Sequence, residues 1–282
     1  MTDPASALRR ALASRFGEEL EVPAGTEGLD ELFRIATHVT HRRWADRPVD
    51  AALVRLLAAC ALSAPSKSDL QQADIVHVRE PARLEAIAAL VPQMPWVRGA
   101  PAFLVFCGNG RRLRRIFARR GQPFVNEHLD GFFNPAVDAA LVMMNFVRAA
   151  QAAGLACCPI SVLRDRASEL SRILELPDHV FPVAGLCAGY PAAELSINPR
   201  LSLRSTFHVD RFDDGETDAL IDEFDDRWAR ARARRTGKPG AFPAAAPPAA
   251  IPRWSDEKAK QYAAPQRADW GAFVKAKGFD LT

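Results

Sequence analysis

Residues 134–164 read NPAVDAALVMMNFVRAAQAAGLACCPISVLR, and this stretch carries the strongest structural signals in the chain. A helix is expected over 134–153, because Asn134 suits its N-cap, a proline follows, and Gly154 suits the position after its end. Apolar side chains occupy more than one side of this helix, which is typical of helices buried centrally or against another subunit. The apolar run 156–162 that follows is predicted to be a strand.

Weaker patterns on both sides of this stretch predict further short elements. Helices are predicted over residues 7–16, 28–37, 81–90, 111–120, 166–174 and 218–235, and strands over 73–78, 102–107 and 181–190. Another helix follows Pro48, with Asp46 as its expected cap. Its buried face would carry Ala52, Leu53, Leu56, Leu57 and Cys60. Because nothing requires a regular alternation of strand and helix, the sequence favours an α+β layered domain.

Composition divides the chain into four segments. These are an N-terminal extension (1–26), a main domain (27–235), a Pro/Ala-rich linker (236–253) and a C-terminal segment (254–282). The linker is expected to be extended. Aromatic residues anchor the helical pattern of the last segment, namely Trp254, Tyr262, Trp270, Phe273 and Phe279. We therefore expect residues 254–282 to form an arm that packs on a dimer.

The overall composition excludes several classes of protein. With 282 residues, 48% hydrophobic and 25% charged, the chain reads as an ordinary globular protein. Its net charge of +3 does not favour nucleic-acid binding, and no apolar run of about 18 residues predicts a membrane span. The N-terminus lacks the pattern of a secretory signal, so a cytoplasmic protein is expected. Motifs of metal hydrolases, serine hydrolases and P-loop proteins are absent.

The five cysteines contain no CxxC pair, and four of them sit inside apolar runs. Neither a disulfide framework nor a zinc site is expected from this pattern. None of the cysteines has the electropositive, polar sequence setting that lowers a thiol pKa. Buried, reduced thiols are therefore expected.

Two polar segments are candidates for ligand binding. In HVTHRRW (38–44), His38, Thr40 and Arg42 alternate, so an extended backbone would point all three to one side. An imidazole, a hydroxyl and a guanidinium suit a phosphate, although a solvated basic loop is the alternative. The loop SAPSKSDLQQ (63–72) offers donors and acceptors for a polar ring or a ribityl chain, and the alternative is a simple turn.

For the remaining features, the residues alone do not distinguish between the possible roles. The predicted strand end at 160–162 offers backbone N–H groups to a ligand, followed by Arg164, which suits an anion or the solvent. Arg200 follows a proline and suits an anion or a surface ion pair. The run RWARARARR (227–235) is compatible with a solvated helix face, a nucleic-acid patch or a clamp for the extra phosphate of NADPH. CGNG at 107–110 lacks the third glycine of a dinucleotide-binding turn, which does not favour a Rossmann fold.

The order of these motifs along the chain, rather than any one of them, resembles the nitroreductase family. The blocks that carry the resemblance are HVTHRRW (38–44), SAPSKSDLQQ (63–72), AFLVFC (102–107), the stretch 134–164, INPRLSLRSTFHVDRF (197–212) and WSDEKAKQYAAPQRADWGAFVKAKGF (254–279). Within the family, the chain is similar to the major oxygen-insensitive NADPH nitroreductases and their flavin-reductase relatives. The resemblance implies a homodimer, a three-layer fold with a central antiparallel sheet flanked by helices, and two FMN molecules at the subunit interface.

The resemblance also implies roles for individual residues. Contacts to the FMN phosphate fall on His38, Thr40, Arg42 and Arg200. Contacts to the ribityl chain and ring edge fall on Ser66, Lys67, Ser68, Asp69 and Gln71, and the backbone of Ile160, Ser161 and Val162 would face the ring near N5. The positions associated with NADPH or substrate are Arg164, Arg232 and Arg267.

The sequence departs from the family pattern at several of these positions. Val39 stands where a basic residue is expected, and Asn198 stands where a lysine is expected two residues before Arg200. Ser161–Val162 replaces a pair that is usually rich in glycine. Asp69 often corresponds to an asparagine and would place a carboxylate near the flavin, which disfavours an anionic reduced ring. These departures reduce the expectation of tight FMN binding and of efficient nitroreduction.

The implied activity is a ping-pong reaction in which NADPH gives a hydride to flavin N5 and a small acceptor is then reduced by two electrons. The cofactor carries this chemistry, so no nucleophilic side chain is expected. Nitroaromatics and quinones are the expected acceptors. The alternatives are an NADPH:flavin reductase, a flavin-binding or storage protein without turnover, and a basic interaction module acting through residues 227–235.

Overall fold

The computed structural model describes residues 3–236 and 253–282, so residues 237–252 of the predicted linker lie outside the described part. The chain forms two compact units, a helical unit and a sheet unit. The helical unit comprises Met1–Val39 and Leu195–Pro265, and the sheet unit comprises Thr40–Glu194 and Gln266–Thr282. Each unit is therefore assembled from two stretches of chain that are far apart in the sequence.

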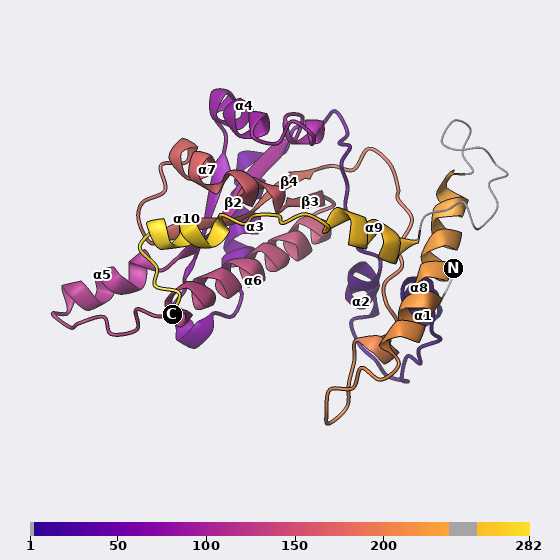
Figure 1. The fold of residues 1–282 in the computed structure, drawn as a ribbon. Helices are drawn as coiled ribbons and strands as arrows, with labels where there is room; N and C mark the ends of the chain where they lie inside the picture. Colours follow the sequence, from indigo (N-terminus) through magenta and orange to yellow (C-terminus); the bar gives the residue numbers. More distant parts are fainter. Residues whose placement is uncertain (1–2, 237–252) are drawn as a thin grey trace. The chain divides into compact units, whose positions relative to one another are not determined.

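The sheet unit is built on a four-stranded antiparallel sheet in the order β1-β2-β4-β3 (Figure 1). Its strands are β1 (Ala73–Val78), β2 (Ala102–Asn109), β3 (Ala156–Ile160) and β4 (Val180–Gly189). All four coincide with predicted strands. The predicted end of β3 is wrong, because Ser161 takes a helical backbone (φ −81°, ψ −22°) and Val162 begins the 3-10 helix η3 (Val162–Arg166).

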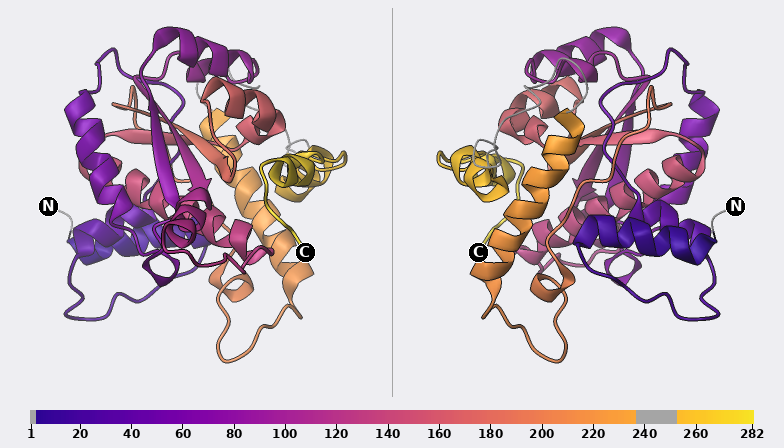
Figure 2. Two further views of the ribbon diagram at one scale, coloured as in Figure 1. Left: turned by 90° about the vertical axis from the view of Figure 1, so that its left-hand side faces the viewer. Right: turned by 90° about the vertical axis from the view of Figure 1, so that its right-hand side faces the viewer.

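Helices cover both faces of this sheet, as Figures 1 and 2 show. One face carries α3 (Ala51–Leu62) and α6 (Asp130–Ala152), and the other carries α4 (Pro81–Ala89) and α7 (Ala167–Ile173). Successive residues of β2 point to opposite faces. Leu104 and Phe106 join the apolar cluster beneath α6, whereas Phe103 and Val105 join the cluster beneath α4 and α7. The predicted α+β fold with helices on both sides of an antiparallel sheet is confirmed.

The long helix α6 begins at Asp130, so the predicted start at Asn134 is wrong, and Pro135 lies inside the helix. Packing explains the difference. The ring centre of Phe132 lies 4.8 Å from that of Phe181 and 5.9 Å from that of Phe279, so one side of the extra turn packs against the core. Tertiary contacts of this kind override local capping signals.

Helix α3 differs from its prediction in both its cap and its buried face. Asp50, not Asp46, caps it by accepting a hydrogen bond from the backbone N–H of Ala52 at 2.8 Å. Its buried residues are Val54, Leu57 and Ala61, which pack in one apolar cluster with residues of α6. The predicted positions Ala52, Leu56 and Cys60 are exposed instead.

Residues 266–282 return to the sheet unit and complete its core. Helix α10 (Trp270–Ala276) places Phe273 and Val274 in a cluster with Phe181. Lys277 is buried and donates through Nζ to the carbonyl of Leu176 (2.7 Å) and to the Ser171 hydroxyl (3.3 Å). Burial lowers the pKa of Lys277.

The helical unit contains α1 (Pro4–Phe16), α2 (Leu29–Ala36), the 3-10 helix η4 (Leu203–Ser205), α8 (Thr217–Thr236) and α9 (Trp254–Gln261). Asp3 caps α1, and an apolar cluster of Leu8, Ala11 and Ala36 joins α1 to α2. Buried Asp225 joins α8 to α9, because it accepts the backbone N–H of Ser255 at 2.9 Å.

The remaining described elements are α5 (Arg111–Arg119) and the 3-10 helices η1 (Lys67–Asp69) and η2 (Pro95–Val97), all in the sheet unit. Among the described residues, no helix is long and apolar enough to cross a membrane.

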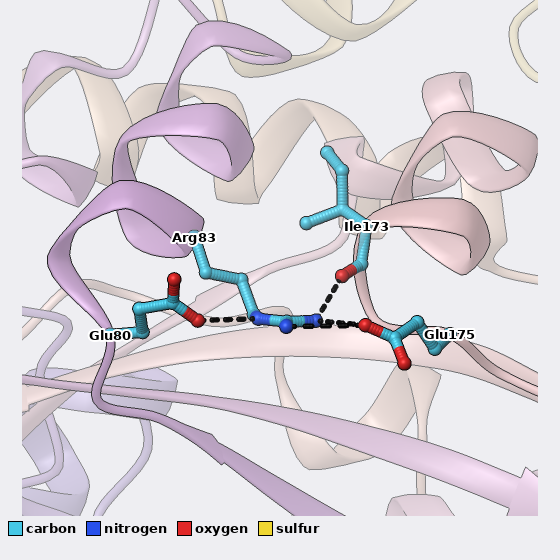
Figure 3. A network of polar contacts seen from close by, with 4 residues as sticks. All are labelled: Glu80, Arg83, Ile173 and Glu175. Atoms are coloured by element: carbon cyan, nitrogen blue, oxygen red, sulfur yellow. Dashed lines mark hydrogen bonds and ion pairs between the residues drawn. The ribbon is translucent and has the colours of Figure 1, made fainter.

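An arginine on α4 ties that helix to the end of α7 (Figure 3). Arg83 donates to Glu80 at 3.2 Å, to Glu175 at 3.3 Å and to the carbonyl of Ile173. Hydrogen bonds to Glu80, and then to Glu175, raise the pKa of Arg83. Exposed ion pairs contribute little to stability, so the network mainly fixes how α4 and α7 meet.

Candidate functional site

The polar loop before β1 has an unusual backbone. Ser68, Asp69 and Gln71 all adopt positive φ angles, of 50°, 55° and 52°. Non-glycine residues rarely occupy this left-handed region, and clusters of them occur at ligand sites. The loop therefore stores strain at the residues that the sequence predicts to meet a ribityl chain.

A carboxylate on α6 holds this loop at both ends. Asp138 is only 1% exposed and accepts the backbone N–H of Lys67 and the backbone N–H of Gln72, each at 3.0 Å. Within the loop, Gln71 donates from its backbone to the Ser66 hydroxyl at 3.2 Å. These bonds keep the left-handed backbone in place and leave the side chains of the loop on the surface.

A cavity of about 510 Å³ lies beside the loop, lined among others by Ser66, Asp69 and Gln71. Gln72 also lines it, and the Gln72 side-chain nitrogen is buried without a hydrogen-bond partner among the described residues. Arg112 closes one side by pairing with Asp74 at 2.5 Å and by donating to the carbonyl of Gln71. The cavity thus presents an unsatisfied donor to any polar ligand that enters.

The segment that contains Thr40 and Arg42 runs beside the edge strand β3. The backbone N–H of His41 donates to the carbonyl of Cys157 at 3.1 Å, which fixes the segment to the sheet. Thr40 is half-buried, and the guanidinium of Arg42 lies over the ring of Trp96, 5.4 Å from its centre. Arg42 is exposed and forms no ion pair with any described residue.

The residues after β3 lie close to the C-terminal stretch of the sheet unit. Ile160 is buried and Ser161 is exposed. The guanidinium of Arg164 donates to the carbonyl of Val183 at 2.5 Å and lies over the ring of Trp270. Arg267 pairs with Asp165 at 3.3 Å, so this arginine already has an acidic partner within the sheet unit.

The other predicted site residues belong to the helical unit. His38 follows α2, and Arg200 is exposed in the stretch before η4. The backbones of both residues are joined to Arg15 of α1, whose guanidinium donates to the carbonyl of His38 at 2.6 Å. Arg232 of α8 pairs with Glu257 at 2.5 Å.

Comparison with known proteins accounts for this arrangement of motifs. The family described as "Nitroreductase family" matches residues 35–190, and its C-terminal domain matches residues 198–282. The chain belongs to the nitroreductase family. The resemblance that the ordered motifs indicated is therefore confirmed.

Relatives of this nitroreductase-family chain include characterised reductases. An "FMN reductase [NAD(P)H]" of Bacillus subtilis is 30% identical over 213 residues, which is 74% of this chain and 85% of that protein. An "Oxygen-insensitive NADPH nitroreductase" of Salmonella typhimurium is 30% identical over 192 residues, 68% and 78% of the two chains. The structure of NfrA2 from B. megaterium matches with a TM-score of 0.82 and 25% identity, covering 90% of this chain and 99% of that one.

Four residues around the predicted contacts of this nitroreductase-family chain were not singled out from the sequence. Asp138 could have been identified from the sequence, because it is a lone carboxylate in an otherwise apolar stretch of helix. No sequence pattern identifies Trp96 or Arg112, because their positions depend on how distant segments meet in the fold. Arg15 lies before the residues that the family matches, and nothing in its local sequence distinguishes it from its neighbours.

The cysteines of the nitroreductase domain have the environment of inert thiols. Cys107, Cys157, Cys158 and Cys187 are buried, whereas Cys60 is exposed. Burial raises the pKa of Cys107 and of Cys157 to about 12, which keeps both thiols protonated. All five cysteines are free, and within the described ranges no cluster of three or more His, Cys, Asp or Glu is placed to hold a metal ion.

Proposed function

We propose that this chain is an FMN-dependent NAD(P)H oxidoreductase that works as a homodimer and reduces small acceptors by two electrons. The relatives with 30% identity are named FMN reductase [NAD(P)H] and oxygen-insensitive NADPH nitroreductase, which supports both the cofactor and the electron donor. Nitroaromatics, quinones and free flavin are the candidate acceptors. Cofactor and acceptor chemistry of this kind needs no nucleophilic side chain.

The observation that carries the proposal is a set of cations without ion-pair partners and of buried donors without acceptors among the described residues. Arg42 and Arg200 form no ion pair with any residue that the structure describes, although both are predicted to meet a phosphate. Buried donors without acceptors among the described residues occur at Gln72 and at the indole nitrogen of Trp44. Unpaired buried donors are costly unless a ligand satisfies them. These cations and donors suit a ligand that combines a phosphate with a polar ring edge, as FMN does.

In this proposal the residues of the chain bind and orient, while bound FMN supplies the hydride-accepting ring. The residues proposed to contact the phosphate are His38, Thr40, Arg42 and Arg200. Ser66, Lys67, Ser68, Asp69 and Gln71 would meet the ribityl chain and ring edge, and the backbone of Ile160, Ser161 and Val162 would lie near the ring. Asp138 keeps the loop in its left-handed form, so that its side chains meet the cofactor already oriented.

The proposal is tested on the purified full-length chain. We expect a yellow protein that binds FMN, is bleached by NADPH, and oxidises NADPH in the presence of a nitroarene, a quinone or free flavin. A yellow protein that NADPH does not bleach would instead indicate a flavin-storage role. Failure to bind added FMN would overturn the proposal altogether.

Selection of NADPH is proposed to depend on Arg164, Arg232 and Arg267. Arg232→Ala is expected to raise KM for NADPH by about tenfold and KM for NADH by much less, because a guanidinium pairs with the 2′-phosphate that only NADPH carries. Glu257 competes for Arg232 at 2.5 Å, so Glu257→Gln is expected to lower KM for NADPH. Steady-state kinetics with both donors provide the measurement, and equal changes for NADPH and NADH would rule out this role of Arg232.

Dimerisation is proposed to use the exposed apolar side of α6. Val137, Leu141 and Met144 are 38%, 41% and 47% exposed, and they follow each other at helical spacing. Apolar residues grouped on one exposed side of a helix are typical of a subunit interface.

The substitution Leu141→Glu is expected to weaken the dimer by about a hundredfold, because it would bury an unpaired charge. Leu141→Met, which keeps the volume and the apolar character, should leave the dimer intact. Light scattering across a concentration series provides the measurement. A wild-type monomer, or a Leu141→Glu protein that is as dimeric as the wild type, would contradict the proposed interface.

A further inference from the structure

A buried arginine in the N-terminal extension lies next to two residues proposed to bind the cofactor. Arg15, in the last turn of α1, is 6% exposed. The family match begins only at residue 35, so α1 lies outside the part of the chain that the family shares. All residues involved belong to the helical unit.

The guanidinium of Arg15 ties together two separate stretches of backbone. Its Nε donates to the carbonyl of Ala36 at 2.7 Å and Nη2 donates to the carbonyl of His38 at 2.6 Å. Its Nη1 donates to the carbonyl of Asn198 at 3.3 Å. The backbone of Arg15 contributes as well, because its carbonyl accepts the N–H of Arg200 at 2.7 Å. One residue thus fixes the backbones that carry the His38 and Arg200 side chains.

Positive charge accumulates at this point. The acceptors of the Arg15 guanidinium are neutral carbonyls, and no described residue forms an ion pair with it. Burial first, and then the positive charge of Arg200, lower the pKa of Arg15. Arg227 donates to the carbonyl of Arg200 at 2.8 Å, and its other terminal nitrogen is buried without a partner. A buried cation without a counter-ion is unfavourable, so a bound anion would stabilise the buried guanidinium of Arg15 and the partly buried one of Arg227, and would also pair with exposed Arg200.

Two acidic residues, Glu18 and Glu223, also lie near Arg227 and attract it. The carboxylate of Glu18 accepts the backbone N–H of Leu203 at 2.6 Å, and that of Glu223 also pairs with Arg204 at 3.9 Å. Two carboxylates do not balance the three guanidiniums of Arg15, Arg200 and Arg227, so the region keeps its positive character.

The position of Arg15 coincides with two departures from the family pattern. The resemblance leads one to expect basic residues at 39 and 198, where this chain has Val39 and Asn198. Arg15 donates to the carbonyl just before Val39 and to the carbonyl of Asn198 itself. The guanidinium from α1 therefore brings a positive charge to the two stretches of backbone that lack the expected ones.

We propose that Arg15 is a positioning residue for the phosphate of FMN, which holds His38 and Arg200 in place and replaces the charge missing at positions 39 and 198. This inference rests on the proposed function, because it requires that the chain binds FMN. It assigns the N-terminal helix to the cofactor site rather than to the periphery of the molecule.

The test compares FMN with riboflavin, which carries the same ring and ribityl chain without the phosphate. Arg15→Gln in the full-length protein is expected to weaken FMN binding by about tenfold, measured by flavin fluorescence, because hydrogen bonds and charge next to an anion are strong. Riboflavin binding should change by less than about twofold. Leu8→Ala is the matched control, since it loosens the packing of α1 without touching the backbone carbonyls. It should lower the melting temperature and leave the ratio of FMN to riboflavin affinity unchanged.

A second substitution distinguishes the effect of charge on FMN affinity from an effect on the stability of the fold. Val39→Lys introduces the expected cation and should restore part of the FMN affinity of the Arg15→Gln protein without restoring its melting temperature. If Arg15→Gln does not fold, Arg15→Lys, which keeps the charge but has one nitrogen for three carbonyls, should show a smaller fall in the same affinity ratio.

Equal losses for FMN and riboflavin in the Arg15 variants would overturn the proposal and leave Arg15 with a structural role. An unchanged FMN affinity would overturn it as well. If the wild-type protein binds no FMN, the proposed function itself fails, and this outcome is distinct from the others.

Discussion

Asp138→Ala is expected to abolish cofactor binding at ordinary FMN concentrations while leaving the chain folded. The carboxylate accepts two backbone N–H groups, from Lys67 and Gln72, at the two ends of the loop. Removing it leaves both donors unsatisfied, at a cost of about 2–4 kcal/mol in the free energy of unfolding. The left-handed angles of Ser68, Asp69 and Gln71 then have no support, and the loop should relax to ordinary backbone conformations.

We expect FMN affinity to fall by about a hundredfold in this variant, because a loop that must be ordered on binding reduces the affinity by the cost of that ordering. Asp138→Asn is the matched control. Its amide keeps one acceptor oxygen and nearly the same volume, so its effect should be intermediate. Equilibrium dialysis with FMN and urea unfolding monitored by circular dichroism give the two quantities. An Asp138→Ala protein with wild-type FMN affinity would show that the loop does not contribute to the site.

Phe106→Ala is expected to lower the free energy of unfolding by about 3–5 kcal/mol, the range for a large aromatic residue removed from a core. Phe106 is completely buried at the centre of β2, and its ring meets that of Phe146 on α6 edge to face, with 5.8 Å between ring centres. This ring contact packs α6 against the sheet. Because α6 also carries Asp138, a cavity at Phe106 should loosen the support of the loop as well.

Phe106→Leu is the control for this experiment, since it removes less volume and keeps the position apolar. Its loss of stability should be clearly smaller, and FMN affinity should follow stability in the series from wild type through Leu to Ala. If Phe106→Ala unfolds at the same urea concentration as the wild type, the assignment of Phe106 to the central core is wrong.

The strands could be predicted from the sequence because β2, β3 and β4 are short apolar runs and β1 has an alternating pattern. The errors lie where contacts between distant segments decide the outcome. The start of α6 depends on Phe132 meeting Phe181 and Phe279, which no local pattern reveals. The buried face of α3 depends on how the helix packs against α6 and the sheet, which places Val54, Leu57 and Ala61 in the core.

In the candidate site too, local motifs could be predicted from the sequence, whereas contacts between distant segments could not. The polar loop and the basic segment at 38–44 were predicted as ligand-binding stretches because their order along the chain, with the other motifs, resembles the nitroreductase family. The supports of these stretches were not predicted. Asp138 is 66 residues away from Gln72 along the chain, and Arg15 is 183 residues away from Asn198. Contacts over such separations arise from the fold as a whole, whereas motifs are read over a few neighbouring residues.

The return of residues 266–282 to the sheet unit has a consequence for biosynthesis. The ribosome delivers the strands and most helices of this unit early, and the ring of Phe181 then lacks its neighbours Trp270, Phe273 and Phe279. Nascent chains fold from the N-terminus as they emerge, so this aromatic patch stays uncovered until the last turns of helix are synthesised. A chain that stops before Trp270 would leave the ring of Phe181 without these aromatic neighbours, and exposed apolar surface of this kind favours aggregation.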